Sequence, residues 1–158
     1  MAFGDVTRSE AEKTFNEFLI EMYDRLQKFI SIGASLGFVF EYRMCECRDI
    51  ELFFDDYIDS FSQNNIEDVI SFFSRYLGEM FIHNYGGRWF LYKGDDIDLD
   101  NNMPVIMGSL DTVDIPFSPR RTMYAYYLRR KEGLIEKIIN SHVQAINIVL
   151  KRQQETRK

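Results

Sequence analysis

Apolar residues recur every three or four positions along several stretches of this chain, and no other feature constrains its fold as strongly. The first stretch runs from Ala11 to Gly33 and predicts one long amphipathic helix, because side chains at this spacing share one face of an α-helix. Three further stretches lie at residues 50–61, 66–81 and 134–150. Apolar stripes of this width are stable only when they pack on one another, so the chain is expected to form a helical core.

Residues that favour helix ends flank these stretches. Thr7 with Glu10, and Ser9 with Glu12, have the spacing of a capping box, so the first helix is expected to begin near Ser9. The other predicted start and break signals are Asp49 for the second helix, Asn64 or Asn65 for the third, and Gly133 before the last. Ser118 before Pro119 predicts the start of a further helix, between the third and the last, that runs through Tyr124, Tyr127 and Leu128. The polar residues from Lys151 onward are expected to fray.

Short β-branched and aromatic segments in the middle of the chain predict a small sheet. Residues 88–93 and 103–107 indicate two strands, and their short connection favours an antiparallel pair. Pro104 must then lie at the start of its strand or on an edge, because proline has no N–H for the ladder. Residues 38–43 are expected to form another brief strand or an extended segment.

Segregation of helices and strands along the chain predicts the fold class. Helices come first, strands lie in the middle and helices close the chain, which is typical of α+β rather than alternating α/β proteins. The chain has 158 residues and no linker long enough to separate two domains, so one domain is expected. The predicted architecture is therefore a single α+β domain with long N-terminal helices, a small central antiparallel sheet and C-terminal helices.

The acidic and basic residues are unevenly distributed, and this bears on possible partners. Of a net charge of −6, residues 41–100 carry 14 acidic side chains against five basic ones, whereas residues 117–158 carry ten basic against three acidic. A nucleic-acid-binding domain normally has an overall basic face, so nucleic acid is not an expected partner. The acidic segment is either an ordinary solvated face or a surface that attracts a basic protein.

Composition also bears on localisation. No apolar run approaches the roughly 18 residues that cross a bilayer, and residues 1–5 lack the start of a secretory signal, so no membrane association is expected. Cys45 and Cys47 are too close for an unstrained disulfide and too few for a zinc site. Two free thiols agree with a reducing compartment, and a cytoplasmic protein is predicted.

Few residues suggest catalysis or metal binding, and neither a catalytic residue nor a cofactor is predicted. Asp96, Asp98 and Asp100 have the spacing of a calcium loop, but Asn101 and Met107 occupy the positions that require Gly and Glu, so no metal is expected.

Two histidines and a tyrosine-rich segment are the basis of an alternative interpretation, in which the protein is an enzyme or binds a ligand. Glu79 and His83 share a helix face, with a helix-end hydrogen bond as the simpler interpretation, and His142 is expected on the surface. Residues 124–127 contain three tyrosines, and their basic neighbours Arg120, Arg121, Arg129 and Arg130 leave base stacking open as an alternative to packing. A small enzyme or ligand-binding domain would use Glu79, His83 or these tyrosines.

Four short motifs support a resemblance to a known group of proteins. They are Tyr76-Leu77-Gly78-Glu79, Gly86-Gly87-Arg88-Trp89, Pro104-Val105 and Pro116-Phe117. Over roughly residues 40–130, this pattern resembles small bacterial domains of uncharacterised function, which recur among immunity proteins of polymorphic toxin and type VI secretion systems. The resemblance implies a helix that runs through a Gly-Gly turn into a small sheet.

The resemblance and the physical properties of the motif residues agree on structural roles. Gly78 is expected to permit close helix packing, Glu79 to anchor nearby backbone, and Trp89 to fill the core. Gly86 and Gly87 supply the backbone freedom that a helix-to-strand turn requires. None of these roles needs a ligand.

Together these observations predict an immunity protein that neutralises a cognate toxin, such as one with a basic active cleft, by binding it with an acidic surface. The expected contact residues are Asp95, Asp96, Asp98 and Asp100, followed by Asp55, Asp56 and Asp59. The alternatives are the small enzyme or ligand-binding domain described above, and an oligomeric scaffold whose first or last helix pairs with a second copy.

Overall fold

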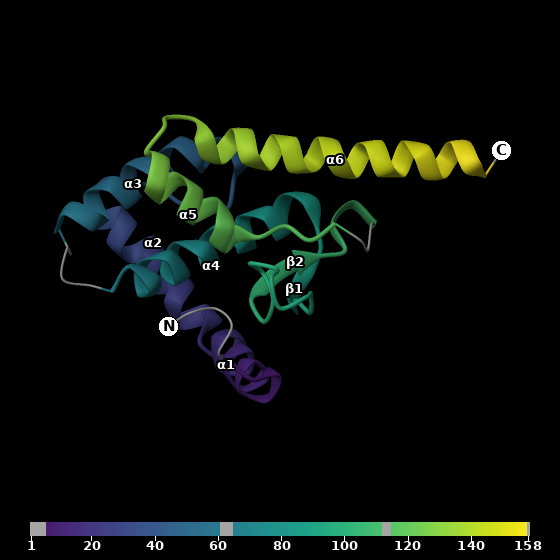
Figure 1. The fold of residues 1–158 in the computed structure, drawn as a ribbon. Coiled ribbons are helices and arrows are strands. Elements are labelled where there is room, and N and C mark those ends of the chain that lie inside the picture. The colour runs from purple at the N-terminus through teal and green to yellow at the C-terminus, as the bar shows by residue number, and fades with distance from the viewer. Residues whose placement is uncertain (1–5, 61–64, 112–114, 158) are drawn as a thin grey trace.

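Helices dominate the part of the chain that the computed structural model describes, residues 6–60, 65–111 and 115–157 (Figure 1). The elements in order are α1 (Arg8–Ile20), α2 (Met22–Ser35), η1 (Met44–Glu46), α3 (Cys47–Ser60), α4 (Ile66–Tyr85), β1 (Arg88–Leu91), β2 (Pro104–Met107), η2 (Ser109–Asp111), α5 (Pro119–Arg129) and α6 (Leu134–Thr156). This confirms a single, mostly helical α+β domain. Residues 1–5, Phe61 and the alternative cap Asn64 lie outside the described ranges.

The predicted antiparallel sheet is confirmed, with strands slightly shorter than expected. Trp89 pairs with Ile106, and Leu91 pairs with Pro104 at the start of β2, where a proline does least damage to the ladder. Beyond β2, Phe117 exchanges two backbone hydrogen bonds with Ile106 and extends the pairing toward α5. The sheet therefore contacts both α4, which leads into β1, and α5, which follows Phe117.

The single long helix expected over residues 11–33 is wrong, because Glu21 separates α1 from α2. The two apolar faces pack on different elements. Phe18 of α1 meets the Trp89 ring of β1 edge on at 5.0 Å, whereas Phe29 of α2 stacks on Tyr76 of α4 at 4.4 Å. The predicted capping box forms at Thr7 rather than Ser9.

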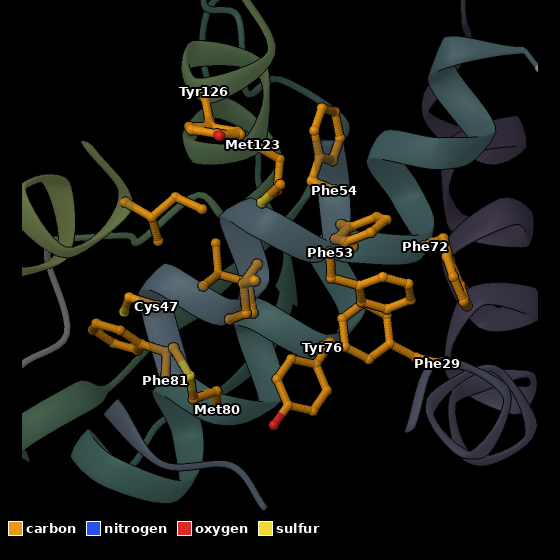
Figure 2. Packing of buried hydrophobic residues seen from close by; sticks show 14 of the residues in the cluster. Phe29, Cys47, Phe53, Phe54, Phe72, Tyr76, Met80, Phe81, Met123 and Tyr126 are labelled. Carbon is orange, nitrogen blue, oxygen red and sulfur yellow. The ribbon is translucent and has the colours of Figure 1, made fainter. Parts of the chain in front are cut away.

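Helix α4 lies at the centre of the core, and aromatic rings from α2, α3 and α5 surround it (Figure 2). Phe29 contacts Phe53 of α3 at 4.9 Å as well as Tyr76, and Phe54 contacts Tyr126 of α5 at 5.7 Å. Because α4 is covered on nearly every side, it is apolar around most of its circumference. Its N-cap is Asn65, as predicted, and Gly86 ends it.

Residues 38–43 form no strand. The aromatic side chain of Phe40 turns into the core against Phe29 and Phe53, and Tyr42 adopts a positive φ of 60°, which interrupts extended backbone. The expected cap at Asp49 is also wrong, because η1 continues directly into α3 at Cys47 and places Asp49 inside the first turn.

The last two helices start as predicted, but the final one runs further. Ser118 caps α5 with Pro119 in its first turn, and Gly133 precedes α6 with a φ of 83°. Helix α6 continues to Thr156 instead of fraying at Lys151, and its second half extends beyond the other helices (Figure 1). In residues 6–60, 65–111 and 115–157, no helix combines the length and apolar character that crossing a membrane requires.

Candidate functional site

The acidic residues after β1 lie in a loop that the rest of the protein holds in place. Backbone bonds close it, from Asn102 N–H to the Tyr92 carbonyl at 2.9 Å and from Tyr92 N–H to the Met103 carbonyl at 3.0 Å. Arg8 at the start of α1 donates to the carbonyls of Leu91 and Tyr92 and to the Asn102 side chain, at 3.1–3.2 Å. The loop is therefore anchored from both the sheet and α1.

Within this loop, apolar side chains stand out from the protein between carboxylates. Ile97 is 92% exposed and Leu99 is 59% exposed, although both are side chains that normally avoid water. Asp95 and Asp96 are exposed and Asp98 is half-buried. We call Asp95, Asp96, Ile97, Asp98 and Leu99 the acidic knob.

Asp100 does not belong to the exterior, which corrects the expectation that it contacts a partner. Its side chain is buried, and one carboxylate oxygen accepts a hydrogen bond from Arg121 of α5 at 3.3 Å. Next to it, the Asn101 side chain accepts from the Gly94 N–H at 3.0 Å. Asp100 and Asn101 therefore attach the loop internally and leave the acidic knob as its outer part.

The second group of acids lies elsewhere, since Figure 1 shows α3 and the sheet in different parts of the molecule. Asp55 is engaged within the fold, because its carboxylate accepts from the Tyr126 hydroxyl at 2.9 Å and from Arg130 at 2.8 Å. Asp56 and Asp59 are exposed on α3. The structure therefore does not unite the two groups into one surface.

The residues of the Leu-Gly-Glu and Gly-Gly-x-Trp motifs meet one another between α4 and β1. The Trp89 indole N–H donates to Glu79 Oε1 at 2.9 Å, so Glu79 anchors a side chain rather than the backbone expected. A Cβ at Gly78 would lie 2.2 Å from Trp89 Cη2, so the indole occupies the space that glycine leaves. Trp89 itself is half-buried and covers the core rather than filling it.

The remaining motif residues are also structural. Gly86 and Gly87 both have positive φ, and a Cβ at Gly87 would lie 2.6 Å from Ser109 Oγ. Pro116 leads into Phe117, whose buried ring stacks on Phe81 of α4 at 4.2 Å. These contacts confirm the predicted helix-to-strand turn.

The candidate catalytic side chains are held by neighbours in the fold. His83 Nδ1 donates to the Glu79 carbonyl at 2.7 Å, which is the helix-end hydrogen bond expected as the simpler interpretation, and the ring stacks on Tyr42 at 4.4 Å. Tyr126 is buried, and its burial together with its hydrogen bond to Asp55 raises the pKa of its hydroxyl to about 12. Tyr124 donates to Glu67, and Tyr127 packs on Phe54.

His142 is not the surface residue that the sequence predicts. Its ring lies against Phe81 and Phe117, with centroids 5.7 and 5.3 Å away. Burial lowers the pKa of this imidazole, because the charged form loses hydration there.

Two buried glutamates escaped the sequence analysis. Glu51 of α3 accepts from the backbone N–H groups of Gly133 and Ile135, at 3.0 and 3.1 Å, and so caps α6 from another helix. Glu46 accepts from the Tyr76 hydroxyl and from the Glu41 N–H. For Glu51, the sequence contained one indication of burial. This acidic residue lies between Ile50 and Phe54, on the apolar face of its helix.

No group of three or more His, Cys, Asp or Glu is arranged to hold a metal ion within the described ranges. Comparisons of the chain with models of protein families, with curated proteins and with solved structures found no match. The resemblance to immunity proteins therefore stays a prediction from the short motifs.

Proposed function

We propose that this protein is an immunity protein that binds and neutralises a protein toxin through the acidic knob. The observation that carries the proposal is the pair of exposed apolar side chains, Ile97 and Leu99, set among Asp95, Asp96 and Asp98 on an anchored loop. Exposing apolar side chains to water is energetically unfavourable, and a partner that covers them gains the free energy of burying their surface.

The acidic knob has the composition that is typical of the centre and rim of a small protein–protein interface. A few apolar anchors supply much of the binding energy in protein complexes, while surrounding polar groups form a rim. Here the anchors and the rim come from consecutive residues. Because Arg8, Asp100 and Asn101 already hold the loop, little conformational entropy is lost when a partner binds it.

The charge of the knob indicates the partner surface. Three carboxylates attract a basic patch, and electrostatic complementarity of this kind accelerates association and selects the partner. Toxins that act on nucleic acids or other anionic substrates have basic clefts, so an acidic knob suits the blocking of such a cleft. Glu79 and His83 give less support for an enzyme, since both side chains are already held within the fold.

The test uses the product of the neighbouring gene as the toxin, with growth inhibition measured with and without this protein. In vitro, the triple variant Asp95→Asn/Asp96→Asn/Asp98→Asn is expected to associate at least tenfold more slowly at low salt, with a smaller difference in 0.5 M salt. The Ile97→Ala variant is expected to dissociate faster, because it removes an apolar anchor.

A matched control changes the net charge equally at a distant surface. The variant Glu132→Gln/Glu136→Gln/Glu155→Gln alters exposed acids before and along α6 and is expected to associate at the wild-type rate. Equal association rates for both triple variants would contradict the acidic knob as the binding surface. Unchanged toxicity in the presence of this protein would contradict the immunity function itself.

A second candidate function is an oligomeric scaffold, and exposed apolar residues on the first and last helices favour it. Ile20 at the end of α1 is 81% exposed, and Ile148 lies 53% exposed on the extended half of α6 (Figure 1). Light scattering tests this function directly. A dimer that Ile20→Ser or Ile148→Ser converts to a monomer would support it, and a monomeric wild-type protein would reject it.

A further inference from the structure

The outer edge of β1 carries backbone groups that β2 does not use. In an antiparallel pair, successive residues turn their N–H and C=O groups alternately toward the partner strand and away from it. Tyr92 turns both groups toward the β2 side, since its N–H donates to Met103 at 3.0 Å and its C=O accepts from Asn102 at 2.9 Å. The N–H and C=O groups of Trp89 and Leu91 therefore point to the outer edge.

The hydrogen bonds of β2 agree with this orientation. Ile106 pairs with Trp89, but its N–H and C=O both bond Phe117 on the far side of β2, at 2.8 and 2.9 Å. Of the outward groups of β1, the Leu91 carbonyl accepts from Arg8 at 3.2 Å. The N–H and C=O of Trp89 and the N–H of Leu91 have no hydrogen bond to residues 6–60, 65–111 or 115–157.

A groove of about 440 Å³ runs between α1 and β1. All four residues of β1 line it, and α1 contributes Arg8, Glu12, Phe15 and Asn16. Because Arg8 bonds the Leu91 carbonyl from α1, the outer edge of β1 faces this groove. The three unpaired backbone groups are therefore directed to a space that a further strand can occupy.

The side chains of β1 alternate between the two faces of the sheet. Trp89 packs beside Gly78 of α4 and Leu91 is buried, so Arg88 and Phe90 project from the opposite face. Phe90 is 39% exposed, and the half-buried Phe15 contributes an apolar ring to the wall formed by α1. An incoming strand is therefore favoured when it carries apolar side chains on both of its faces.

Charge indicates one further property of this strand. Arg8 and Glu12 form an ion pair at 3.6 Å, so their charges largely cancel within the groove. Arg88 is exposed and makes no ion pair with a described residue, so it favours a carboxylate directly across the edge. A second copy of β1 does not supply one, because residues 86–93 contain no acidic side chain.

We infer that this edge binds an extended segment of a partner protein, which adds a strand beside β1 with an acidic residue opposite Arg88 and apolar residues opposite Trp89 and Phe90. Strand addition to an open sheet edge is a general mode of peptide recognition, in which backbone bonds supply affinity and alternate side chains supply specificity. Residues of the acidic knob do not line the groove, and the inference does not depend on the proposed function.

Peptide binding to the full chain tests the inference. The probe is the acetylated and amidated heptapeptide Ser-Thr-Val-Ile-Glu-Thr-Ser, whose Val, Ile and Glu face Phe90, Trp89 and Arg88 in an antiparallel pair. We expect saturable binding by Trp89 fluorescence and, in the complex, about tenfold or slower hydrogen exchange of the Trp89 and Leu91 N–H groups. The Phe90 N–H, which faces β2, is the control and is protected with or without peptide. No saturable binding, or a Trp89 N–H already protected in the free monomer, would overturn the proposal.

Two N-methylated peptides separate strand pairing from adhesion of apolar side chains. Methylation at the Ile nitrogen removes the N–H that donates to the Trp89 carbonyl and is expected to weaken binding about tenfold or more. Methylation at the Glu nitrogen alters an N–H that points away from β1, so binding should change by less than about threefold. Equal losses with the two peptides would show that no strand is added.

Charge variants test the acidic preference. Arg88→Glu is expected to weaken the heptapeptide about threefold or more and to favour a peptide with Lys in place of Glu. Arg129→Glu makes the same change at the exposed end of α5 and should leave both affinities unchanged. Equal binding of the Glu and Lys peptides to the wild-type chain would contradict the acidic preference without any variant. A wild-type dimer in which the Trp89 N–H is protected would assign the edge to a second copy and reject the proposal.

Discussion

The ring of Trp89 occupies the space beside Gly78, where an added Cβ would lie 2.2 Å from Cη2 and 2.3 Å from Cζ2 of the indole. The same indole is held by its hydrogen bond to Glu79, the next residue of α4. Two consecutive residues of α4 thus fix the only tryptophan of the chain, and with it the first strand, against this helix.

Gly78→Ala is expected to destabilise the protein by about 1–3 kcal/mol, because the added methyl group displaces a side chain that is held on its other side. Urea denaturation measures the effect. The double variant with Trp89→Leu is the control, since alanine is favoured over glycine in a helix by about 1 kcal/mol once the ring is gone. A cost that stays the same in the Trp89→Leu background would contradict a steric conflict with the indole.

Glu51→Gln is expected to lower the free energy of unfolding by about 2–4 kcal/mol. The amide replaces one of the two oxygens that accept from Gly133 and Ile135, so a buried N–H loses its acceptor. Thermal or urea unfolding is the measurement. Glu136→Gln, on the exposed side of α6, is the matched control and should change stability by less than about 0.5 kcal/mol.

His142 is expected to make the protein less stable as the pH falls below about 6.5, the ordinary pKa of histidine. Burial lowers the pKa of this imidazole in the folded state. As the pH falls, the unfolded chain therefore binds a proton at a higher pH than the folded protein does, and the free energy of unfolding decreases. Above that pH, His142 makes its full contribution to the free energy of unfolding. The slope of stability between pH 7 and 5 should decrease in His142→Gln, whereas His83→Gln leaves the contribution of His142 in place.

The two thiols are expected to react very differently with a thiol reagent at pH 8. Cys45 is exposed, whereas burial raises the pKa of the Cys47 thiol to about 12 and leaves almost no thiolate. One thiol per chain should react in the native protein and two in urea. The Cys45→Ser variant should react only when unfolded, and rapid native labelling of this variant would show that Cys47 is accessible.

Local signals predicted most of the elements. The Thr7 capping box, Asn65, Ser118 with Pro119, and Gly133 mark helix starts that the structure contains, because caps depend on residues within one turn. The Gly-Gly turn and the antiparallel pair were predictable for the same reason. The break at Glu21 was not predictable, because the apolar spacing continues through it from Phe18 to Met22 and Leu26.

The candidate site was predictable only in part. The alternating acids of residues 95–100 were evident, but the sequence could not separate Asp100, which bonds Arg121, from the exposed Asp95 and Asp96. The exposure of Ile97 was equally invisible, because apolar residues in a short segment are usually buried.

By itself, the sequence determined the fold class, most helix starts and the hairpin, because these follow from side-chain spacing and from hydrogen bonds between near neighbours. Only the tertiary structure decided that Glu51 caps α6, that Gly78 receives Trp89, and that Arg8 of α1 bonds the outer edge of β1. These relationships join residues far apart in the chain. Which residues contact each other depends on which surfaces pack together, and the spacing of residues along the chain does not predict this.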